Sequence, residues 1–473
     1  MLDQKNDFNN ISIVGLGRLG VSLAACFAEK GYSILGFDED NYKRKMFQKG
    51  LAPVLETGLD DLLKENRPRL KSAPNYFDIV NHSRVTFVTV ANFQELSGAF
   101  SSKPLETILT HLAAEIKLKD NFHLIVIVSA TMPGTIDQVL LPMLEKQTGK
   151  ECGAGFGLCY WPDFTTPGRT IHDVRQPEIA ILGQSDVNSG DAIVDLLHKI
   201  IEDRAPIQRM NFINAEVARI AAFTYLATKL SFSHVFAEMC ESLPGADWSA
   251  LLKSLNLDGQ EKLKIDTWLA NPFNIRLSHE NRALRYLYSQ HTKATPLVET
   301  VESLLSRQVH RMMDIIFKYL PEGGRVGILG LASLPQTDIV KNSPGIKLAT
   351  WLYKQDIPVT VYDPLAMAVA REAMMDNVSY AGSIEEIFAA CDMFVLATAW
   401  PEFAALPVNV LKQKLNRPII LDCCHILDQS EYRQLADVLT QGVGDLLLKP
   451  KRSRTDYDYS LVDLLSISNI HSN

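Results

Sequence analysis

The sequence lacks any apolar run long enough to cross a membrane, and it has no C-x-x-C motif. Its best apolar stretch, 220–239, is interrupted by Lys229, His234 and Glu238, whereas a spanning helix needs about 20 mostly apolar residues. The first ten residues are polar and do not read as a signal peptide. The seven cysteines are odd in number and include no C-x-x-C pair, so we expect free thiols, no metal site and a cytoplasmic location.

The chain also lacks the excess of basic residues that general nucleic-acid binding requires. It has 47 lysines and arginines against 55 acidic residues, a net charge of −8, so we expect no nucleic-acid partner. Its 47% hydrophobic and 22% charged residues are ordinary for a globular protein. A chain of 473 residues is too long for one compact core, which predicts two to four domains.

A glycine-rich motif directly follows the first apolar run. Residues 11–14 lead into G-L-G-R-L-G at 15–20, and a second apolar run at 34–37 ends at Asp38. Strand, glycine turn, helix, strand and terminal acid within about 30 residues are the fingerprint of a dinucleotide-binding unit. The alternative, a glycine turn that binds nothing, is disfavoured by this intact context.

Each residue of the fingerprint has a physical task. Gly15 permits the tight turn, Gly17 lets the backbone approach a pyrophosphate, and Gly20 lets the helix pack on the strand. Asp38 would accept hydrogen bonds from the adenosine ribose and repel a 2′-phosphate. The predicted cofactor is therefore NAD rather than NADP.

Apolar runs and helical stretches alternate through the first part of the chain, which is typical of a doubly wound parallel sheet. A long helical pattern begins near Asn214, which we predict as its N-cap, and continues without glycine or proline to Leu243. After Gly324 the strand-then-glycine theme returns, and the next strand ends at Asp363. We predict domains at 1–208, 209–318 and 319–473. The strands predicted in the first part are 11–14, 34–37, 85–90, 124–128, 157–160 and 179–182.

Several further motifs lie in a fixed order along the chain. They are G-L-A-P-V-L-E-T-G-L at 50–59, S-A-T-M-P-G-T at 129–135, W-P-D-F at 161–164, L-A-T-K-L-S-F at 226–232, N-R-A-L at 281–284 and W-P-E-F at 400–403. With the glycine motif, they make the chain resemble the UDP-glucose/GDP-mannose (nucleotide-sugar 6-) dehydrogenase family over nearly its whole length.

That resemblance implies an α/β fold: two Rossmann-like doubly wound parallel sheets joined by a long central helix and an all-α domain. It implies NAD at the first sheet, with Glu56 in the cofactor-binding loop, and a nucleotide sugar at the third domain. It also implies a homodimer through the central helix. Family members oxidise an alcohol to a carboxylate by two hydride transfers to two NAD, and a cysteine carries the intermediate as a thioester.

Several catalytic positions of the family have changed in this chain. Aligned through N-R-A-L, Arg276 occupies the cysteine position, and no cysteine lies between Cys240 and Cys391. Arg219 occupies the position of the helix lysine and Phe223 that of the asparagine. An arginine is not a nucleophile and stays protonated, so four-electron oxidation by the family route is not expected.

Three acidic or basic residues remain as candidates for proton transfer. By the resemblance, Glu280 occupies the aspartate position, His279 the basic position and Asp163 the first glutamate position, while Ala130 replaces a threonine. Glu280 is the first candidate for a base that removes the proton of an alcohol.

Two functions remain open at this point. Arg219 and Arg276 would line the substrate pocket together with Phe223, and their two positive charges favour an anionic ligand. Alternatively, the two arginines pair with Glu280 and Asp163.

The first hypothesis is an NAD-dependent oxidoreductase limited to one two-electron step on a nucleotide sugar or related alcohol. The second is a catalytically inactive relative with a regulatory or structural role.

Overall fold

The computed structural model describes residues 8–444 apart from 92, 203–205, 258–274, 292–295, 375–376, 407, 413–416, 428–431, 433 and 441. Contacts divide the chain into two compact units, each described by itself below. The first unit is Met1–Ala222 with Arg282–Lys293, and the second is Phe223–Asn281 with Ala294–Asn473. The three-domain division at 208 and 318 stays a prediction.

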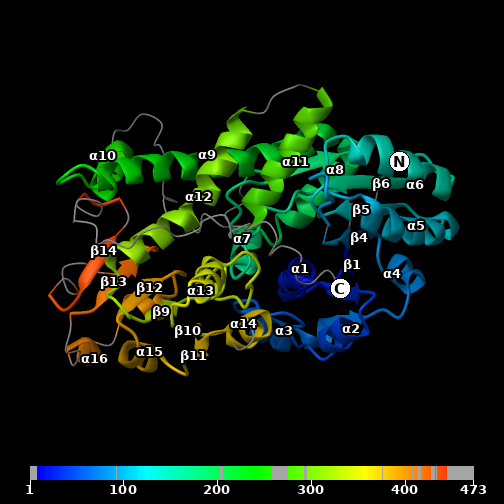
Figure 1. Ribbon diagram of the computed structural model, residues 1–473. Coiled ribbons are helices and arrows are strands. Elements are labelled where there is room, and N and C mark those ends of the chain that lie inside the picture. The colour runs from blue at the N-terminus through cyan, green and yellow to red at the C-terminus, as the bar shows by residue number, and fades with distance from the viewer. Residues whose placement is uncertain are drawn as a thin grey trace. The chain divides into compact units, whose positions relative to one another are not determined.

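The first unit is built on an eight-stranded sheet in the order β3-β2-β1-β4-β5-β6-β7-β8. Figure 1 shows β1, β4, β5 and β6 side by side in this order. All six predicted strands are present, and two short strands, β3 and β8, were not predicted. From β1 the chain first adds strands on one side of the sheet and then, from β4 on, on the other side. Ligands of doubly wound folds bind at this switch point between β1 and β4. The strands are β1 Asn10–Val14, β2 Ser33–Phe37, β3 Leu70–Ser72, β4 Val85–Val88, β5 His123–Ile127, β6 Phe156–Tyr160, β7 Ile181–Gln184 and β8 Gln208–Met210.

One strand pair departs from the predicted parallel arrangement. Strand β7 runs antiparallel to β6, with Tyr160 opposite Gly183. The connection between β6 and β7 contains the six-residue helix α7, Thr170–Arg175. This helix packs with α1, Arg18–Glu29, in one hydrophobic core.

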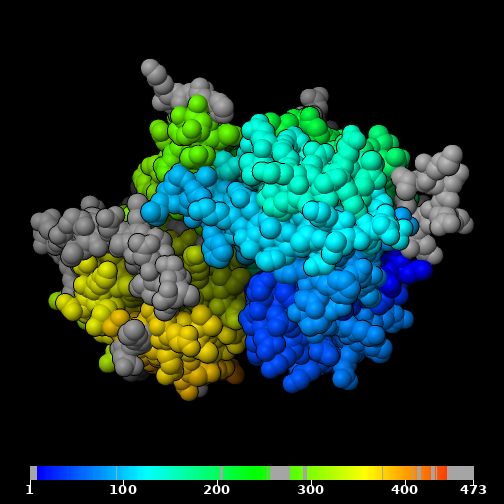
Figure 2. Space-filling view, turned by 90° about the vertical axis from the view of Figure 1, so that its right-hand side faces the viewer, coloured from blue at the N-terminus to red at the C-terminus, as the bar shows by residue number. Residues whose placement is uncertain are grey.

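Helices cover both faces of the first sheet because its strands are apolar on both sides. On one face Ile11 and Ile13 of β1 pack in the core that contains α1 and α8; on the other, Val14 packs in the core that contains α4 and α5. The outward residues of α5 contribute to the blue-to-cyan surface of this unit (Figure 2). The remaining helices are α2 Asn41–Gln48, α3 Leu59–Glu65, α4 Tyr76–His82, α5 Lys103–Leu118, α6 Leu141–Thr148 and α8 Val187–Leu197.

Four helices lie between the two sheets in sequence: α9 Phe212–Glu241, α10 Trp248–Leu257, α11 Ile275–His291 and α12 Pro296–Tyr319. The predicted long helix is therefore present as α9. The predicted N-cap at Asn214 is wrong: the helix starts earlier, and the Asn211 side chain accepts the backbone N–H of Asn214 at 3.0 Å. A cap accepts from the second or third helical residue, which makes Asn211 the capping residue.

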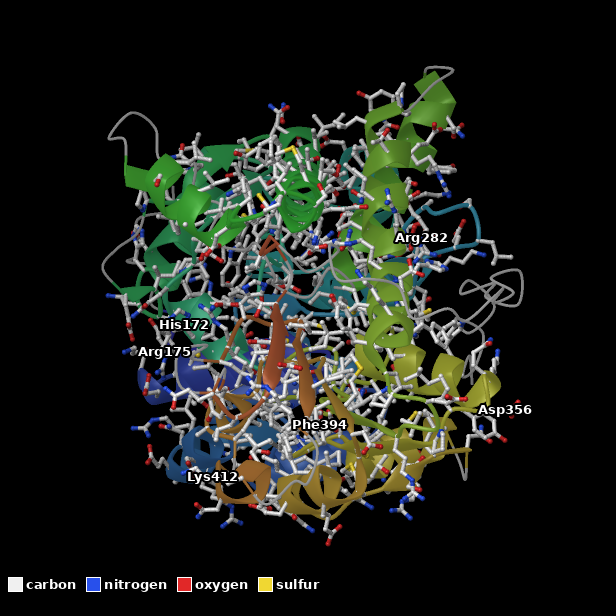
Figure 3. The ribbon with its side chains drawn as sticks, turned by 60° about the vertical axis from the view of Figure 1, so that its left-hand side comes forward. His172, Arg175, Arg282, Asp356, Phe394 and Lys412 are labelled. Atoms are coloured by element: carbon white, nitrogen blue, oxygen red, sulfur yellow. The ribbon has the colours of Figure 1, made fainter. Side chains whose placement is uncertain are left out.

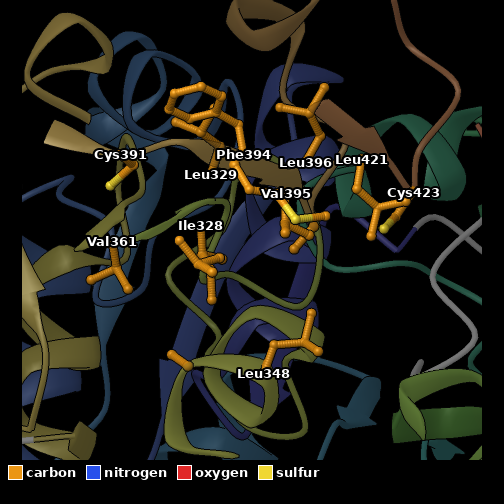
Figure 4. Close-up of a cluster of buried hydrophobic side chains, with 14 of the residues drawn as sticks. Ile328, Leu329, Leu348, Val361, Cys391, Phe394, Val395, Leu396, Leu421 and Cys423 are labelled. Atoms are coloured by element: carbon orange, nitrogen blue, oxygen red, sulfur yellow. The ribbon is translucent and has the colours of Figure 1, made fainter. Parts of the chain in front are cut away.

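The second unit contains a six-stranded parallel sheet in the order β11-β10-β9-β12-β13-β14. Its core gathers Ile328, Val361, Phe394 and Leu421 from four adjacent strands (Figure 4). The predicted second Rossmann-like sheet is confirmed. Its elements are β9 Val326–Leu329, α13 Pro344–Lys354, β10 Val359–Tyr362, α14 Met367–Met374, β11 Ser379–Tyr380, α15 Ile384–Ala390, β12 Met393–Leu396, α16 Val408–Lys412, β13 Ile419–Asp422 and β14 Asp437–Thr440.

Candidate functional site

The glycine turn at the end of β1 is a close-packed structure. Gly15 has a φ of +100°, which side chains rarely tolerate. A Cβ at Gly20 would lie 1.9 Å from the carbonyl oxygen of Gly15. Thr89, at the end of the neighbouring strand β4, donates its hydroxyl to the same carbonyl at 2.7 Å, so the turn is held from the switch point of the sheet.

Gly17 has a different environment. It is the N-cap of α1, it makes no side-chain cap, and the first turn of the helix has no acidic residue. A Cβ placed on Gly17 would meet no atom within 4 Å. The backbone N–H groups of a 12-residue helix therefore start at an open turn, which fits the pyrophosphate of a dinucleotide.

Asp38 lies at the end of β2 and keeps hydrogen-bonding capacity. Its two carboxylate oxygens accept the backbone N–H of Leu16 at 2.8 Å and that of Asp40 at 2.9 Å. Lys43 Nζ lies 3.6 Å from the same carboxylate, whose side chain is 14% exposed. An ionised carboxylate has about four lone-pair sites, so two remain for the ribose hydroxyls that the sequence predicted as its partners.

Glu56 fastens two loops together beside the glycine turn. One oxygen accepts the N–H of Thr170 at 2.9 Å; the other accepts that of Gly168 at 3.0 Å and pairs with Arg18 Nη1 at 2.9 Å. Arg18 is the first residue of α1, so Glu56 positions a guanidinium at the glycine turn. A direct contact between Glu56 and the cofactor stays a prediction.

Helix α7 follows this loop and lies at the surface. Its His172 and Arg175 side chains appear close together in Figure 3. Arg175 pairs with Glu29 at 2.8 Å. This pair joins α7 to the far end of α1, so the loop held by Glu56 is fixed at both ends.

Arg219 is held within the first unit and does not face solvent. It is 4% exposed. Its guanidinium carbon lies 5.6 Å from the ring centroid of Phe100, and its Nε donates to the backbone carbonyl of Asp163 at 3.4 Å. The structure therefore brings Arg219 and Asp163 together, through the main chain of Asp163. The Asp163 carboxylate itself accepts the N–H and hydroxyl of Thr165 at 2.8 and 2.7 Å.

An apolar cluster surrounds this region. Ala130 packs at the edge of a core formed by Ala99, Phe100, Met132, Ile220 and Ala283. The position that the resemblance gives to a threonine is thus filled by packing side chains. Ala130 itself has no hydroxyl with which to hold a water molecule.

The remaining predicted residues lie in the second unit. Phe223 is buried on α9, and Glu280 on α11 is only 1% exposed, while His279 is partly exposed. Arg276 lies in the first turn of α11, but its side chain is outside the described part, so its predicted place in the pocket stays a prediction. From residue 275 the chain is helical, because glycine and proline are absent there and helix-forming residues follow.

Sequence reasoning missed the roles of three residues of this region. Arg18 and Thr89 could have been found from a cation inside the glycine motif and a hydroxyl at the end of the strand beside β1. No sequence signal pointed to the role of Gly168, because that role is a backbone N–H that binds Glu56.

Two kinds of feature are absent from the described residues. None of the helices in the described part is long and apolar enough to span a membrane. No cluster of three or more metal-ligating side chains was found among those residues either.

Comparison with known proteins adds independent information. Residues 9–201 match the model for the UDP-glucose/GDP-mannose dehydrogenase family, NAD binding domain, and residues 327–429 match the UDP binding domain of that family. The chain is 28% identical to UDP-glucose 6-dehydrogenase AglM of Haloferax volcanii, over 89% of this chain and 98% of that protein. It is 26% identical to GDP-mannose 6-dehydrogenase of Pseudomonas aeruginosa, over 96% of both chains.

Solved structures agree with this assignment of the fold. A UDP-glucose dehydrogenase from Pyrobaculum islandicum superposes with a TM-score of 0.81 at 22% identity, over 93% of this chain and 99% of that one. A ternary complex of GDP-mannose dehydrogenase from Pseudomonas aeruginosa has a TM-score of 0.51 at 25% identity, over 88% and 97% of the two chains.

Proposed function

Because the chain belongs to the UDP-glucose/GDP-mannose dehydrogenase family, we propose that it binds NAD with a nucleotide sugar and performs at most one two-electron oxidation of an alcohol. The observation that carries this proposal is the open N-terminus of α1 at Gly17, where a Cβ would meet nothing within 4 Å. The family models that match the two sheets are those of an NAD-binding and a UDP-binding domain.

Different residues around the turn would bind different parts of NAD. The N–H groups of α1 and the Arg18 guanidinium would bind the pyrophosphate, and Asp38 would bind the adenosine ribose. Bound NAD supplies an acceptor for hydride. The chain itself must then orient the alcohol and take up its proton; Glu280 is the first candidate for that base, followed by Asp163 and His279.

The limit of two electrons follows from the chemistry of the changed positions. By the resemblance, Arg276 stands where a thiolate would attack an aldehyde, and a guanidinium cannot form a thioester. Ala130 in the apolar cluster supports the same limit, because by the resemblance it replaces a threonine and its methyl group cannot hold the hydrolytic water.

A second candidate function is a catalytically inactive protein with a regulatory or structural role. The observation that favours it is the burial of Arg219 over Phe100, with Nε on the carbonyl of Asp163. A guanidinium so engaged is less available to a substrate oxyanion than a mobile lysine.

Turnover and binding measurements distinguish these functions. The protein is incubated with NAD and either UDP-glucose or GDP-mannose, cofactor reduction is followed by absorbance, and NAD binding is measured by calorimetry. One reduced cofactor per sugar supports the oxidoreductase, whereas NAD binding without reduction supports the inactive protein. Two reduced cofactors per sugar would overturn the two-electron limit. Absence of NAD binding would overturn the oxidoreductase, and absence of binding to both NAD and the nucleotide sugars would overturn both functions.

Any turnover also allows the base to be tested. Glu280→Gln should abolish it if Glu280 takes the proton, while the exposed Glu65→Gln on α3 should not change it. An unchanged rate in Glu280→Gln would remove that residue from the role.

We also propose that the protein forms a homodimer through α9. Tyr225, Phe232, Val235 and Met239 lie on one side of this helix and are 43–64% exposed. An apolar row of this length is typical of an interaction surface. In light scattering we expect a dimer, which Phe232→Asp should convert to monomers; Tyr353→Asp, at an equally exposed residue on α13, should leave the dimer intact. A wild-type monomer would contradict this assembly.

All seven cysteines are free. Their state supports the proposed location in a reducing cytoplasm, where thiols stay unpaired.

A further inference from the structure

Asn281 on α11 is a buried amide without a hydrogen-bonding partner. Its side chain is 0% exposed, and both Oδ1 and Nδ2 lack a partner. Within the described ranges it is the only residue with two such side-chain atoms. Leaving a buried polar group unsatisfied costs free energy, so an amide with both ends unpaired calls for an explanation.

The packing of α11 prevents Asn281 from turning toward water. The next residue, Arg282, is on the same helix (Figure 3), and a Cβ on Gly98 would lie 2.8 Å from the Arg282 carbonyl oxygen. Ala283 is fully buried in the cluster with Phe100. The helix is thus held in place directly after Asn281, and the amide keeps its buried position.

The chemistry of the amide defines what it can bind. A carboxamide has two donors and one acceptor group and carries no charge. It therefore fits a neutral ligand that both donates and accepts, such as the hydroxyl groups of a sugar. A phosphate offers only acceptors and would leave Oδ1 unpaired.

We infer that Asn281 is a specificity-determining residue that hydrogen-bonds the hydroxyl groups of the sugar in a bound nucleotide sugar. This inference rests on the proposed function. It also agrees with the neighbouring Glu280, which must reach the alcohol of the same sugar if it is the base. The cost of the unpaired amide in the free protein is then offset when the sugar binds, and a ligand without the sugar gains nothing from Asn281.

The test compares ligands with and without the sugar. In Asn281→Leu, which keeps the number of side-chain heavy atoms and the branching at Cγ, we expect binding of UDP-glucose to weaken about tenfold, the loss typical of one or two hydrogen bonds. Binding of UDP and of NAD, measured in the same calorimetric series, should not change. The melting temperature of the ligand-free variant should rise, because the unpaired amide is gone.

Ser233→Ala is the matched control, because the Ser233 hydroxyl on α9 is also buried and without a partner. Its melting temperature should not fall, and its UDP-glucose affinity should equal that of the wild type. Asn281→Ala provides a second variant if leucine does not fit.

The possible results separate the inference from the proposed function. Equal UDP-glucose affinity in both Asn281 variants and the wild type, or an equal loss for UDP, overturns the inference alone. A selective loss for NAD assigns the amide to the nicotinamide and also overturns it. A lower melting temperature in Asn281→Leu with unchanged selectivity makes Asn281 structural. A wild type that binds neither NAD nor UDP-glucose overturns the proposed function together with the inference.

Discussion

Among single residues, Gly17 and Gly20 of the same motif are glycines for different reasons. Gly20 cannot carry a side chain because its Cβ would overlap the Gly15 carbonyl at 1.9 Å. Gly17 has an ordinary φ of −77° and open space around it. The fold therefore does not require a glycine at this position, which supports the proposed close approach of a pyrophosphate.

This difference predicts a clean binding defect. Gly17→Ala should weaken NAD binding at least about tenfold, because the methyl group takes the place of the approaching pyrophosphate, while the melting temperature stays within about 1 °C of the wild type. Calorimetric titration and thermal unfolding check both. The exposed Gly382→Ala serves as the control, and full NAD affinity in Gly17→Ala would contradict the assignment.

Glu216 on α9 is a second residue whose environment sets its behaviour. It is fully buried and accepts the N–H of Gly134 at 2.7 Å and that of Ile136 at 3.2 Å. Burial raises its pKa to about 7, although these hydrogen bonds act in the opposite direction. The folded protein therefore holds a proton that the unfolded chain, with its pKa of 4.5, releases earlier.

The expected consequence is a pH-dependent stability. Because the pKa of Glu216 is raised in the folded state, its protonation stabilises the fold. This contribution is complete below pH 4.5 and is lost as the pH rises through about 7. Between pH 5 and 8, wild-type stability should fall by about 1–3 kcal/mol more than that of Glu216→Gln. Denaturant unfolding at both pH values measures this difference; Glu65→Gln should follow the wild type, and parallel curves for Glu216→Gln would disprove the raised pKa.

At the scale of elements, α9 and α12 are joined within the second unit by two ion pairs of different burial. Arg311 donates to both oxygens of Glu241 at 2.5 Å, and this carboxylate also accepts the N–H of Gly442 at 2.7 Å. About one turn away, Arg307 pairs with Glu238. The Arg307 side chain is 57% exposed, whereas that of Arg311 is 8% exposed.

The two pairs should respond differently to truncation. Arg311→Met leaves the Glu241 charge buried without its cation and should destabilise the second unit by about 3–5 kcal/mol. The matched Arg307→Met should cost less than about 1 kcal/mol. Scanning calorimetry of both variants measures the loss of stability. Equal losses in Arg311→Met and Arg307→Met would contradict the expectation that the buried ion pair is the more costly one to break.

The strands also differ in how well they could be predicted from the sequence. The six predicted strands are mostly buried runs such as Val85–Val88, whereas β8 exposes Gln208 and Arg209 and has no apolar pattern. Strand direction was not visible either, so the antiparallel β7 was missed. Periodicity records which side chains are buried, but not which way a strand runs.

On the scale of the whole molecule, the first six strands of the first sheet and the six strands of the second follow the same order, but the acids at the corresponding strand ends have different surroundings. Asp363, the counterpart of Asp38, is 1% exposed. Its carboxylate already accepts the backbone N–H groups of Leu331, Ala332, Leu365 and Ala366 and the indole N–H of Trp400. It has no capacity left for a ribose, although the sequence repeats the same strand-then-acid pattern.

The chain should therefore bind one NAD and not two. Calorimetric titration should give one site per chain, and Asp38→Ala should weaken that site, whereas Asp363→Asn should act on the stability of the second unit. A second site of comparable affinity would show that the Asp363 carboxylate is open to ligands.

Local sequence alone determined the features that depend on neighbouring residues: the glycine turn, the six buried strands, the long helix and the two similar sheets. These follow from backbone sterics and apolar periodicity, which act over a few residues. The tertiary structure decided what each polar group does. Burial and partners from distant segments engage Asp363 and Arg219, join Glu56 to Arg18, and leave Asn281 unpaired, because desolvation and hydrogen bonding depend on which segments meet in the folded chain.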